Sequence, residues 1–259
     1  MRPGAGARNG KRPLFAGRCE IWIAVIPEFT EHQAVLNGLL TPDERAYVHR
    51  LGGGWLTASL SRGLLRLILA QYLDLPPAEI EIDRSCPDCA RPHGRPRLRT
   101  PPGGTVGAME FSVSHGGDLL VFAFADRAPV GVDVEPVGAV EEVGAELVEF
   151  TLSDAERLRL LELPAAQRRR IFLHHWTGKE AILKALGTGL DVEPQAVSLP
   201  PFPIDGKASV ALPGSTPVDL WISDVDVGPA HICTLATGQQ VRELRSARLS
   251  PSFLLSGSG

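Results

Sequence analysis

Two long stretches of the chain carry apolar residues at the spacing of a helix. The segment WLTASLSRGLLRLILAQYLDL, which follows Gly52 to Gly54, repeats leucine at steps of three and four and stops before Pro76. A second long helix is predicted from about Ala165 to Leu186, because Gly187 is a suitable residue just beyond a helix end. The first of these two helices is expected to be mostly buried.

Two capping boxes predict the starts of shorter helices. Thr41-Pro42-Asp43-Glu44 combines an N-cap threonine with proline at the first helical position and glutamate at the third. A helix is expected from there to about Leu51. Ser153-Asp154-Ala155-Glu156 has the same pattern and opens a helix that Pro164 interrupts.

The pattern changes to period two between about Met109 and Val137, which is typical of strands. Three apolar segments follow one another there, MEFSVSH, DLLVFAFADR and PVGVDVEPV, with Gly116-Gly117 and Asp126-Arg127 at the joints. We predict three consecutive strands in a meander. Further strands are predicted in VSLP, SVALPG, VDLWISDVDV and HICTLATG.

Helices followed by strands thus occur twice, which favours an α+β architecture of two lobes. The expected organisation is a disordered leader at 1–13, an N-terminal lobe at 14–126, a C-terminal lobe at 127–247 and a tail at 248–259.

Composition is that of a globular protein. Of 259 residues, 44 % are hydrophobic and 22 % are charged, which excludes a disordered chain and a membrane protein; apolar runs such as LLVFAFA are too short to span a bilayer.

The start lacks the apolar segment of a secretory signal and there are four cysteines, so we expect a cytoplasmic protein. A net charge of −4 argues against nucleic-acid binding. The arginine-rich stretch 84–99 suits a polyphosphate ligand, although a solvated loop is also compatible with it.

Acidic residues are the first candidates for chemistry. Strand alternation places Asp133 and Glu135 on one face, about 7 Å apart, where they repel each other unless a cation lies between them. They are either half of a Mg²⁺ site or a solvent-facing edge. Glu180 completes such a site if its helix packs over the strand, and Lys184 then holds a phosphate oxygen; otherwise the two form an ordinary surface pair at i and i+4. Trp176 is expected to anchor the helix in the core.

Two further groups of residues are open to more than one interpretation. Ser114-His115, followed by glycines, suits anion binding but is also compatible with a structural role. Cys86, Cys89 and His93 have the spacing of a zinc site that lacks a fourth ligand, and two reduced cysteines in a turn is the alternative.

Three motifs, taken in their order and spacing, resemble those of the 4′-phosphopantetheinyl transferases: FSVSH at 111–115, VGVDVE at 130–135 and WTGKEAILKALG at 176–187. The form of the last motif resembles the W/KEA subgroup of the surfactin-synthetase-activating type. Arg62 in LSRGLLR and Arg95 in HGRPRL agree with it, so the resemblance covers roughly residues 40–200. It implies a monomer of two pseudo-symmetric α/β lobes with coenzyme A between them.

The resemblance also implies an activity: transfer of 4′-phosphopantetheine from coenzyme A to a serine of an apo acyl or peptidyl carrier protein, with release of 3′,5′-ADP, in polyketide or nonribosomal peptide synthesis. By matched position, the implied Mg²⁺ (or Mn²⁺) ligands are Asp133, Glu135 and Glu180. Glu180 is also implied as the general base. Lys184 is implied as the group that stabilises the pyrophosphate or protonates the departing ADP oxygen. The implied contacts of the coenzyme A phosphates are Arg62, Arg95, Ser114, His115 and Lys184.

This sequence departs from the family pattern at two positions. Gly116 stands where many members have a hydroxyl residue, and Arg95 replaces a frequent lysine, which keeps the charge but changes its geometry. Two other classes of function stay open: an inactive module that binds coenzyme A or a carrier protein, and a zinc-stabilised interaction protein built around Cys86 and Cys89.

Overall fold

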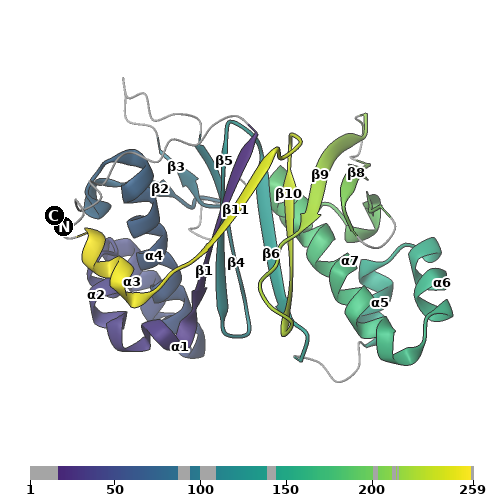
Figure 1. Ribbon diagram of the computed structural model, residues 1–259, viewed down its shortest axis with the longest axis horizontal. Coiled ribbons are helices and arrows are strands. Elements are labelled where there is room, and N and C mark those ends of the chain that lie inside the picture. Colours follow the sequence, from purple (N-terminus) through teal and green to yellow (C-terminus); the bar gives the residue numbers. More distant parts are fainter. Residues whose placement is uncertain are drawn as a thin grey trace, which may run out of the picture.

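The computed structural model describes residues 17–86, 94–99, 109–138, 144–200, 204–211, 214 and 216–257. A mixed sheet and an antiparallel sheet lie side by side at the centre of the molecule, and a group of helices covers the outer side of each (Figure 1). None of the helices in these residues is long and apolar enough to cross a membrane.

The described residues of the first half of the chain form three strands of the first sheet, a separate pair of strands and four α-helices. The first sheet has four strands in the order β11-β1-β5-β4, where β11 (Glu243–Arg248) comes from near the end of the chain, and the pair β2-β3 lies beside it. The strands are β1 (Arg18–Val25), β2 (Ile82–Asp83), β3 (Arg97–Leu98), β4 (Met109–Gly116) and β5 (Leu119–Asp126). The helices are α1 (Ile26–Phe29), α2 (Gln33–Gly38), α3 (Pro42–His49) and α4 (Trp55–Leu73).

The second half repeats this plan. Its five-stranded sheet has the order β6-β10-β9-β8-β7. The strands are β6 (Val130–Pro136), β7 (Val197–Ser198), β8 (Gly206–Val210), β9 (Val218–Asp224) and β10 (His231–Thr237), and the helices are α5 (Ala145–Thr151), α6 (Asp154–Glu162) and α7 (Ala165–Leu186). In both halves the first strand pairs antiparallel with the last, β1 with β5 and β6 with β10. The α+β class and the two lobes expected from the sequence are confirmed.

The helix predictions are confirmed at both ends. Thr41 and Ser153 each form a complete capping box with the glutamate three residues later. α7 begins at Ala165 and ends at Leu186, and Gly187 follows it in the left-handed conformation at φ 74°. A glycine adopts this conformation without the steric cost of a Cβ.

β5 shows why the run LLVFAFA is apolar at every position. Leu120, Phe122 and Phe124 face the helices of the first lobe, where they share a core with residues of α4. The alternate residues, Val121, Ala123 and Ala125, face the other way and share a core with β6 and β10. Because alternate residues of a strand point to opposite faces, a strand that is covered on both faces has no solvent side. This second core joins the two lobes.

The predicted meander is correct for two strands and wrong for the third. β4 and β5 form the hairpin, with Gly116 paired to Leu119. β6 pairs with β10 and not with β5. β4 instead lies against β6, where the backbone N–H of Val132 donates to Ser112 Oγ at 3.1 Å. The backbone hydrogen bonds of β6 are formed with β10, about a hundred residues later in the chain. The local sequence pattern contains no signal for this pairing.

One late segment returns to the first lobe. β11 (Glu243–Arg248) runs parallel to β1, with Arg18 opposite Glu243. Leu249 and Leu254 are buried in the core of the first lobe. By strand pairing, residues 243–248 therefore belong to the first sheet, and the lobe limits 14–126 and 127–247 stay a prediction based on chain order.

Candidate functional site

A glycine lets α7 lie directly on the face of β6 that carries the acidic residues. A Cβ at Gly131 would stand 1.9 Å from the carbonyl oxygen of Ala181, so only glycine fits. The strand alternation predicted for this segment is confirmed, because Val130, Val132 and Val134 point away into the core between the sheets. α7 can therefore bring its own side chains to Asp133.

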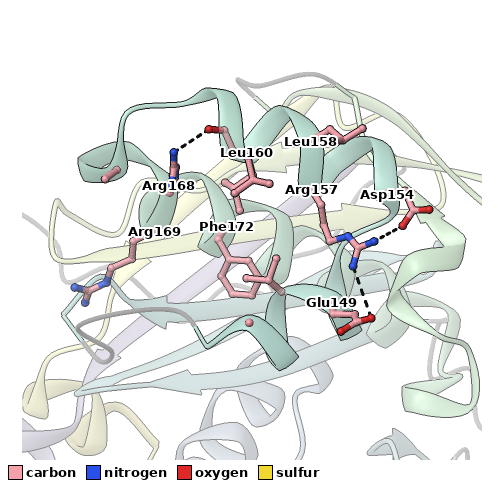
Figure 2. Close-up of a pocket in the computed structure, with 12 residues that line it drawn as sticks. Glu149, Asp154, Arg157, Leu158, Leu160, Arg168, Arg169 and Phe172 are labelled. Carbon is pink, nitrogen blue, oxygen red and sulfur yellow. Dashed lines mark hydrogen bonds and ion pairs between the residues drawn. The ribbon is translucent and has the colours of Figure 1, made fainter.

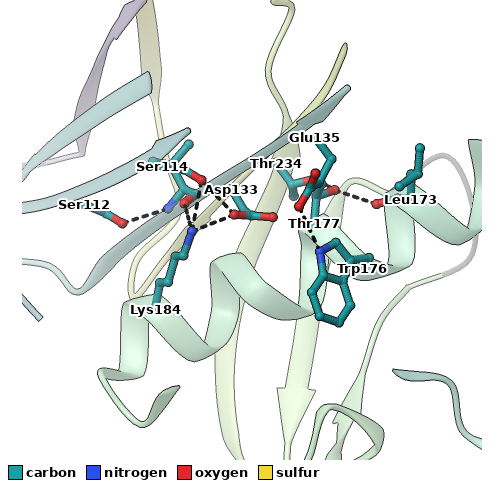
Figure 3. Close-up of polar contacts among 10 residues, drawn as sticks. Ser112, Ser114, Asp133, Glu135, Leu173, Trp176, Thr177, Lys184 and Thr234 are labelled. Carbon is teal, nitrogen blue, oxygen red and sulfur yellow. Dashed lines mark hydrogen bonds and ion pairs between the residues drawn. The ribbon is translucent and has the colours of Figure 1, made fainter. Parts of the chain in front are cut away.

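Three elements meet at Asp133 (Figure 3). Ser114 of β4 donates its hydroxyl to Asp133 Oδ1 at 2.8 Å, and Lys184 of α7 donates to the same oxygen at 2.6 Å. Lys184 Nζ also lies 3.0 Å from Ser114 Oγ and 3.3 Å from the carbonyl oxygen of Val132. Asp133 is 5 % exposed. A serine of the first lobe thus meets a lysine and an aspartate of the second lobe at this point.

The other oxygen of Asp133 has no such partner. Oδ2 is buried and accepts no hydrogen bond from any part of the chain that the structure describes. A buried carboxylate oxygen without a partner is costly. Asp133 therefore has unused capacity to bind a cation or a donor.

Glu135 and Glu180 both interact electrostatically with Asp133, and these three carboxylates are called the acidic cluster below. Burial raises the pKa of Glu135, and repulsion by Asp133 raises it further, while Trp176 and Lys184 act against this. Burial also raises the pKa of Glu180, again with a contribution from Asp133 and an opposing one from Lys184. Both carboxyls therefore hold a proton more readily than exposed carboxyls do, and a bound cation would relieve the repulsion between their charged forms.

Hard carboxylate oxygens of this kind are the ligands that Mg²⁺ prefers. Oδ2 of Asp133, which has no hydrogen-bond partner among the described residues, fits such an ion. As the side chains stand, no three His, Cys, Asp or Glu residues within the described ranges are gathered closely enough to form a complete metal site. Lys184, and not a third carboxylate, is the close partner of Asp133. The donor set fits Mg²⁺ in its chemistry, with the lysine as an immediate neighbour.

Trp176 has two roles in this site. Its ring packs on the cluster formed by Leu152, Leu160, Phe172 and others, as expected for a core anchor. Its indole N–H also donates to Glu135 Oε1 at 3.2 Å (Figure 3). The hydrogen bond was not predicted from the sequence, and it fixes the second acidic residue of β6 against α7.

Arg95 and His115 lie around the same junction. Arg95 donates to the carbonyl oxygen of Ala185 at 2.9 Å and to Glu110 Oε2 at 2.9 Å, and so joins the end of α7 to β4. His115 follows Ser114 on β4, and its side chain is exposed. Arg95 also lies 3.4 Å from the carbonyl oxygen of Val130 at the start of β6, and within the described residues neither Arg95 nor His115 hydrogen bonds to Asp133.

Arg62 lies apart, in a cluster that the sequence did not reveal. Its guanidinium carbon is 4.6 Å from the centre of the Tyr47 ring. Arg84 is close enough to Arg62 that burial, together with repulsion from Arg62, lowers the pKa of Arg84 to about 10. The Nε atoms of both arginines are buried without a hydrogen-bond partner in the described chain. Glu44 opposes the positive charge of this group, and it is already paired with Arg66 at 2.9 Å. The one available signal was the arginine-rich character of residues 84–99.

Lys179 precedes Glu180 but serves a different purpose. Its side chain is fully buried, and Nζ donates to Glu156 Oε2 at 2.7 Å and to the carbonyl oxygen of Pro194 at 3.1 Å. Glu156 is also the capping-box residue of α6. This ion pair fastens α6 to α7 and lies outside the acidic cluster.

A separate pocket of about 870 Å³ lies between α5, α6 and α7 (Figure 2). Leu158, Leu160 and Phe172 line it together with arginines that include Arg157, Arg168 and Arg169. Arg168 donates to the carbonyl oxygens of Leu163 and Leu161, so it completes the end of α6. None of the predicted site residues lines this pocket.

The possible zinc site falls only partly within the structure. Cys86 is described, whereas Cys89 and His93 lie outside the described residues. The two remaining cysteines, Cys19 and Cys233, are buried in the core between the sheets, and burial raises the pKa of both thiols. A zinc site therefore stays a prediction.

Comparisons with known proteins point to one family. The model of the 4′-phosphopantetheinyl transferase superfamily matches residues 129–236. A phosphopantetheinyl transferase of Thraustochytrium sp. is 30 % identical over 208 residues, which cover 74 % of this chain and 68 % of the relative. The 4′-phosphopantetheinyl transferase psf-1 of Bacillus pumilus is 31 % identical over 154 residues, 60 % of this chain and 59 % of the relative. The 4′-phosphopantetheinyl transferase Sfp of Bacillus subtilis is 30 % identical over 119 residues, which cover 46 % of this chain and 51 % of the relative. The chain spans about half to two thirds of the length of these relatives.

Proposed function

The chain belongs to the phosphopantetheinyl transferase family, and from this premise we propose that it transfers 4′-phosphopantetheine from coenzyme A to a serine hydroxyl of an apo carrier protein. The product besides the holo carrier is 3′,5′-ADP. One observation carries the proposal: Asp133 is buried between both lobes with an unpartnered Oδ2, beside the carboxylates of Glu135 and Glu180.

These three residues would hold Mg²⁺, with Mn²⁺ as an alternative. The support is chemical, because all three offer hard oxygen donors and their mutual repulsion is relieved by a cation. When bound, the ion neutralises charge that develops on the departing pyrophosphate oxygen. The chain itself must then orient coenzyme A, bring the carrier serine into line and accept a proton.

The reaction is a single phosphoryl transfer. The serine oxygen bonds to the phosphorus that carries pantetheine, the bond from this phosphorus to the bridging oxygen breaks, and the hydroxyl proton passes to a base. We assign the base role to Glu180, because burial and the neighbouring Asp133 raise the pKa of its carboxyl toward the range useful for proton transfer. Lys184, as an ammonium group, would stabilise the charge on the pyrophosphate.

Coenzyme A would be held through its phosphates. Ser114 and Lys184 both hydrogen bond to Asp133. His115 is the next residue after Ser114 on β4, and Arg95 donates to the carbonyl oxygen of Ala185 near the end of α7. Arg62 offers a buried Nε without a partner in the first lobe, and Arg84 offers another beside it. Because buried guanidinium groups that repel each other gain from an anion, this part of the first lobe suits a phosphate.

The finer assignment rests on the motif WTGKEAILKALG at 176–187. We propose the surfactin-synthetase-activating type and its W/KEA subgroup, acting on acyl or peptidyl carrier proteins of polyketide or nonribosomal peptide synthesis. A monomer in the cytoplasm, with the lobe limits given above, completes the proposal.

The rival function is a module that binds coenzyme A or a carrier without turnover. The presence of all three carboxylates and Lys184 favours the enzyme. Release of 3′,5′-ADP, followed by chromatography, distinguishes the two: the enzyme releases it only when Mg²⁺ and an apo carrier are both present, and not with a carrier whose serine is replaced by alanine. A protein that binds coenzyme A but releases no 3′,5′-ADP with several apo carriers is the binding module.

A further inference from the structure

The closest charged neighbour of Asp133 is a side chain of the same protein. Lys184 Nζ lies 2.6 Å from Oδ1, and the side chain of Asp133 is 7 % exposed while that of Lys184 is 31 % exposed. A buried carboxylate that loses its only cationic partner is strongly destabilised. In the protein without bound metal, Lys184 therefore supplies the positive charge that Asp133 requires.

This arrangement competes with metal binding. A divalent cation on Asp133 would face an ammonium group that already shares Oδ1 with Ser114. Two cations at such short range repel each other, and little solvent is present to screen them. Oδ2, which has no partner in the described chain, offers a place for the ion, but the lysine charge beside it opposes binding.

We propose that Lys184 is a resident counter-cation that holds Asp133 in the metal-free protein and is displaced from it when the divalent ion binds. The inference rests on the proposed metal site and goes beyond it, because it gives Lys184 a second state. In the metal-free state the ammonium group neutralises Asp133. In the loaded state the same group is released from the carboxylate and is free to meet an anion.

The partial exposure of Lys184 supports this exchange. An ammonium group that leaves Asp133 can be solvated without unfolding the helix, because a third of its side chain already reaches solvent. Lys179, five residues earlier, offers the contrast: its side chain is 0 % exposed against Glu156, so it has no second environment to enter. Of the two lysines of α7, only Lys184 is placed to act as an exchangeable charge.

Calorimetric titration of the purified full-length protein with Mg²⁺, in the absence of coenzyme A, tests the proposal. Lys184→Met removes the competing charge and should bind Mg²⁺ at least about tenfold more tightly than wild type. Lys184→Arg keeps the charge and should stay within a few-fold of wild type. Lys207→Met, on the exposed side of β8 against Trp221, is the matched control and should not change the affinity.

The outcomes separate the inference from the proposed function. Tighter binding by Lys184→Met alone supports the counter-cation. Equal affinity of wild type and Lys184→Met overturns it while the metal site stands. Absence of Mg²⁺ binding in both proteins overturns the inference together with the metal site, although transfer activity could then still be measured separately.

A second measurement uses the wild-type protein and does not depend on the folding of a variant. Acetylation of lysine amines, followed by peptide mass spectrometry, reports how available each Nζ is. Lys184 should react several-fold faster with Mg²⁺ present than in Na⁺ of equal ionic strength, while Lys207 should not change. A Lys184 rate that Mg²⁺ leaves unchanged contradicts displacement.

Discussion

The indole nitrogen of Trp176 lies 3.2 Å from Oε1 of Glu135, so a residue of α7 positions the second acidic residue of β6. Trp176→Phe keeps an aromatic ring at this position, and it removes the hydrogen bond together with one of the two rings of the indole. We expect kcat/KM for carrier modification to fall about tenfold or more, because Glu135 is a proposed metal ligand and the loss of a ligand's outer hydrogen-bond partner typically has an effect of this size. Thermal unfolding should change little, because one such bond contributes about 1 kcal/mol.

The comparison variant for Trp176→Phe is Trp55→Phe. Trp55 is 40 % exposed at the start of α4, away from the acidic cluster. Equal loss of activity in both variants would show that the Trp176 hydrogen bond has no special part in the reaction.

The close approach of β6 and α7 at Gly131 gives a second prediction. Gly131→Ala places a methyl group 1.9 Å from the Ala181 carbonyl oxygen, so the helix must shift away from the strand. We expect a loss of about 2 kcal/mol or more in the free energy of unfolding, and activity should fall with it. Gly53→Ala, where nothing lies within 4 Å, is the control and should be nearly neutral. Chemical denaturation of both variants measures the difference.

The ion pair between Lys179 and Glu156 predicts a stability effect at a distance from the reaction. Lys179→Met leaves Glu156 buried without its partner, which typically costs about 3–5 kcal/mol. Adding Glu156→Gln removes the unpaired charge and keeps the capping box, because glutamine serves at that position. The double variant should regain a large part of the lost stability. A double-mutant cycle that shows no coupling between these two residues would contradict the ion pair.

The raised pKa values of Glu135 and Glu180 predict how stability changes with pH. A carboxyl whose pKa is higher in the folded than in the unfolded chain binds its proton more tightly when folded. The stability of the metal-free protein therefore falls as pH rises from the ordinary value of 4.5 through the raised values. Glu180→Gln removes part of this loss, so it should melt at a higher temperature than metal-free wild type at pH 7.

Two further measurements check the origin of that effect. The difference in melting temperature between Glu180→Gln and wild type should shrink as pH falls below 4.5, because the Glu180 carboxyl is then protonated in the folded and in the unfolded chain. Mg²⁺ should stabilise wild type more than the variant. A variant that melts below wild type at pH 7 without metal would mean that Glu180 is stabilised by partners other than those described.

The sequence predicts those parts of the fold and site whose signals are local. Capping boxes, the leucine spacing of α4 and the glycine after α7 are properties of neighbouring residues, and all three correspond to observed helix ends. The face shared by Asp133 and Glu135 follows from the two-residue period of a strand in the same way. Motif order then indicated that Glu180 and Lys184 approach this face.

What the sequence does not predict depends on pairing between distant segments. The partner of β6 is β10, with Asp133 opposite Thr234, and β11 returns to β1 across the whole chain. No local pattern specifies either choice. The same holds for side chains: Lys179 and Glu180 are neighbours in the sequence, but residues on a helix point about 100° apart, so one enters the core and the other approaches Asp133. The pairing of Lys184 with Asp133, in place of a third carboxylate, also appears only in three dimensions.

The central claim, that this chain transfers phosphopantetheine through the acidic cluster at Asp133, is tested most directly by the intact mass of an apo carrier protein. The carrier is incubated with coenzyme A, Mg²⁺ and either wild type or Asp133→Asn, with EDTA as a further control. We predict a gain of one phosphopantetheine with wild type, none with EDTA and none at matched times with Asp133→Asn. An equal gain with Asp133→Asn, or a gain that persists in EDTA, would contradict the role of this site.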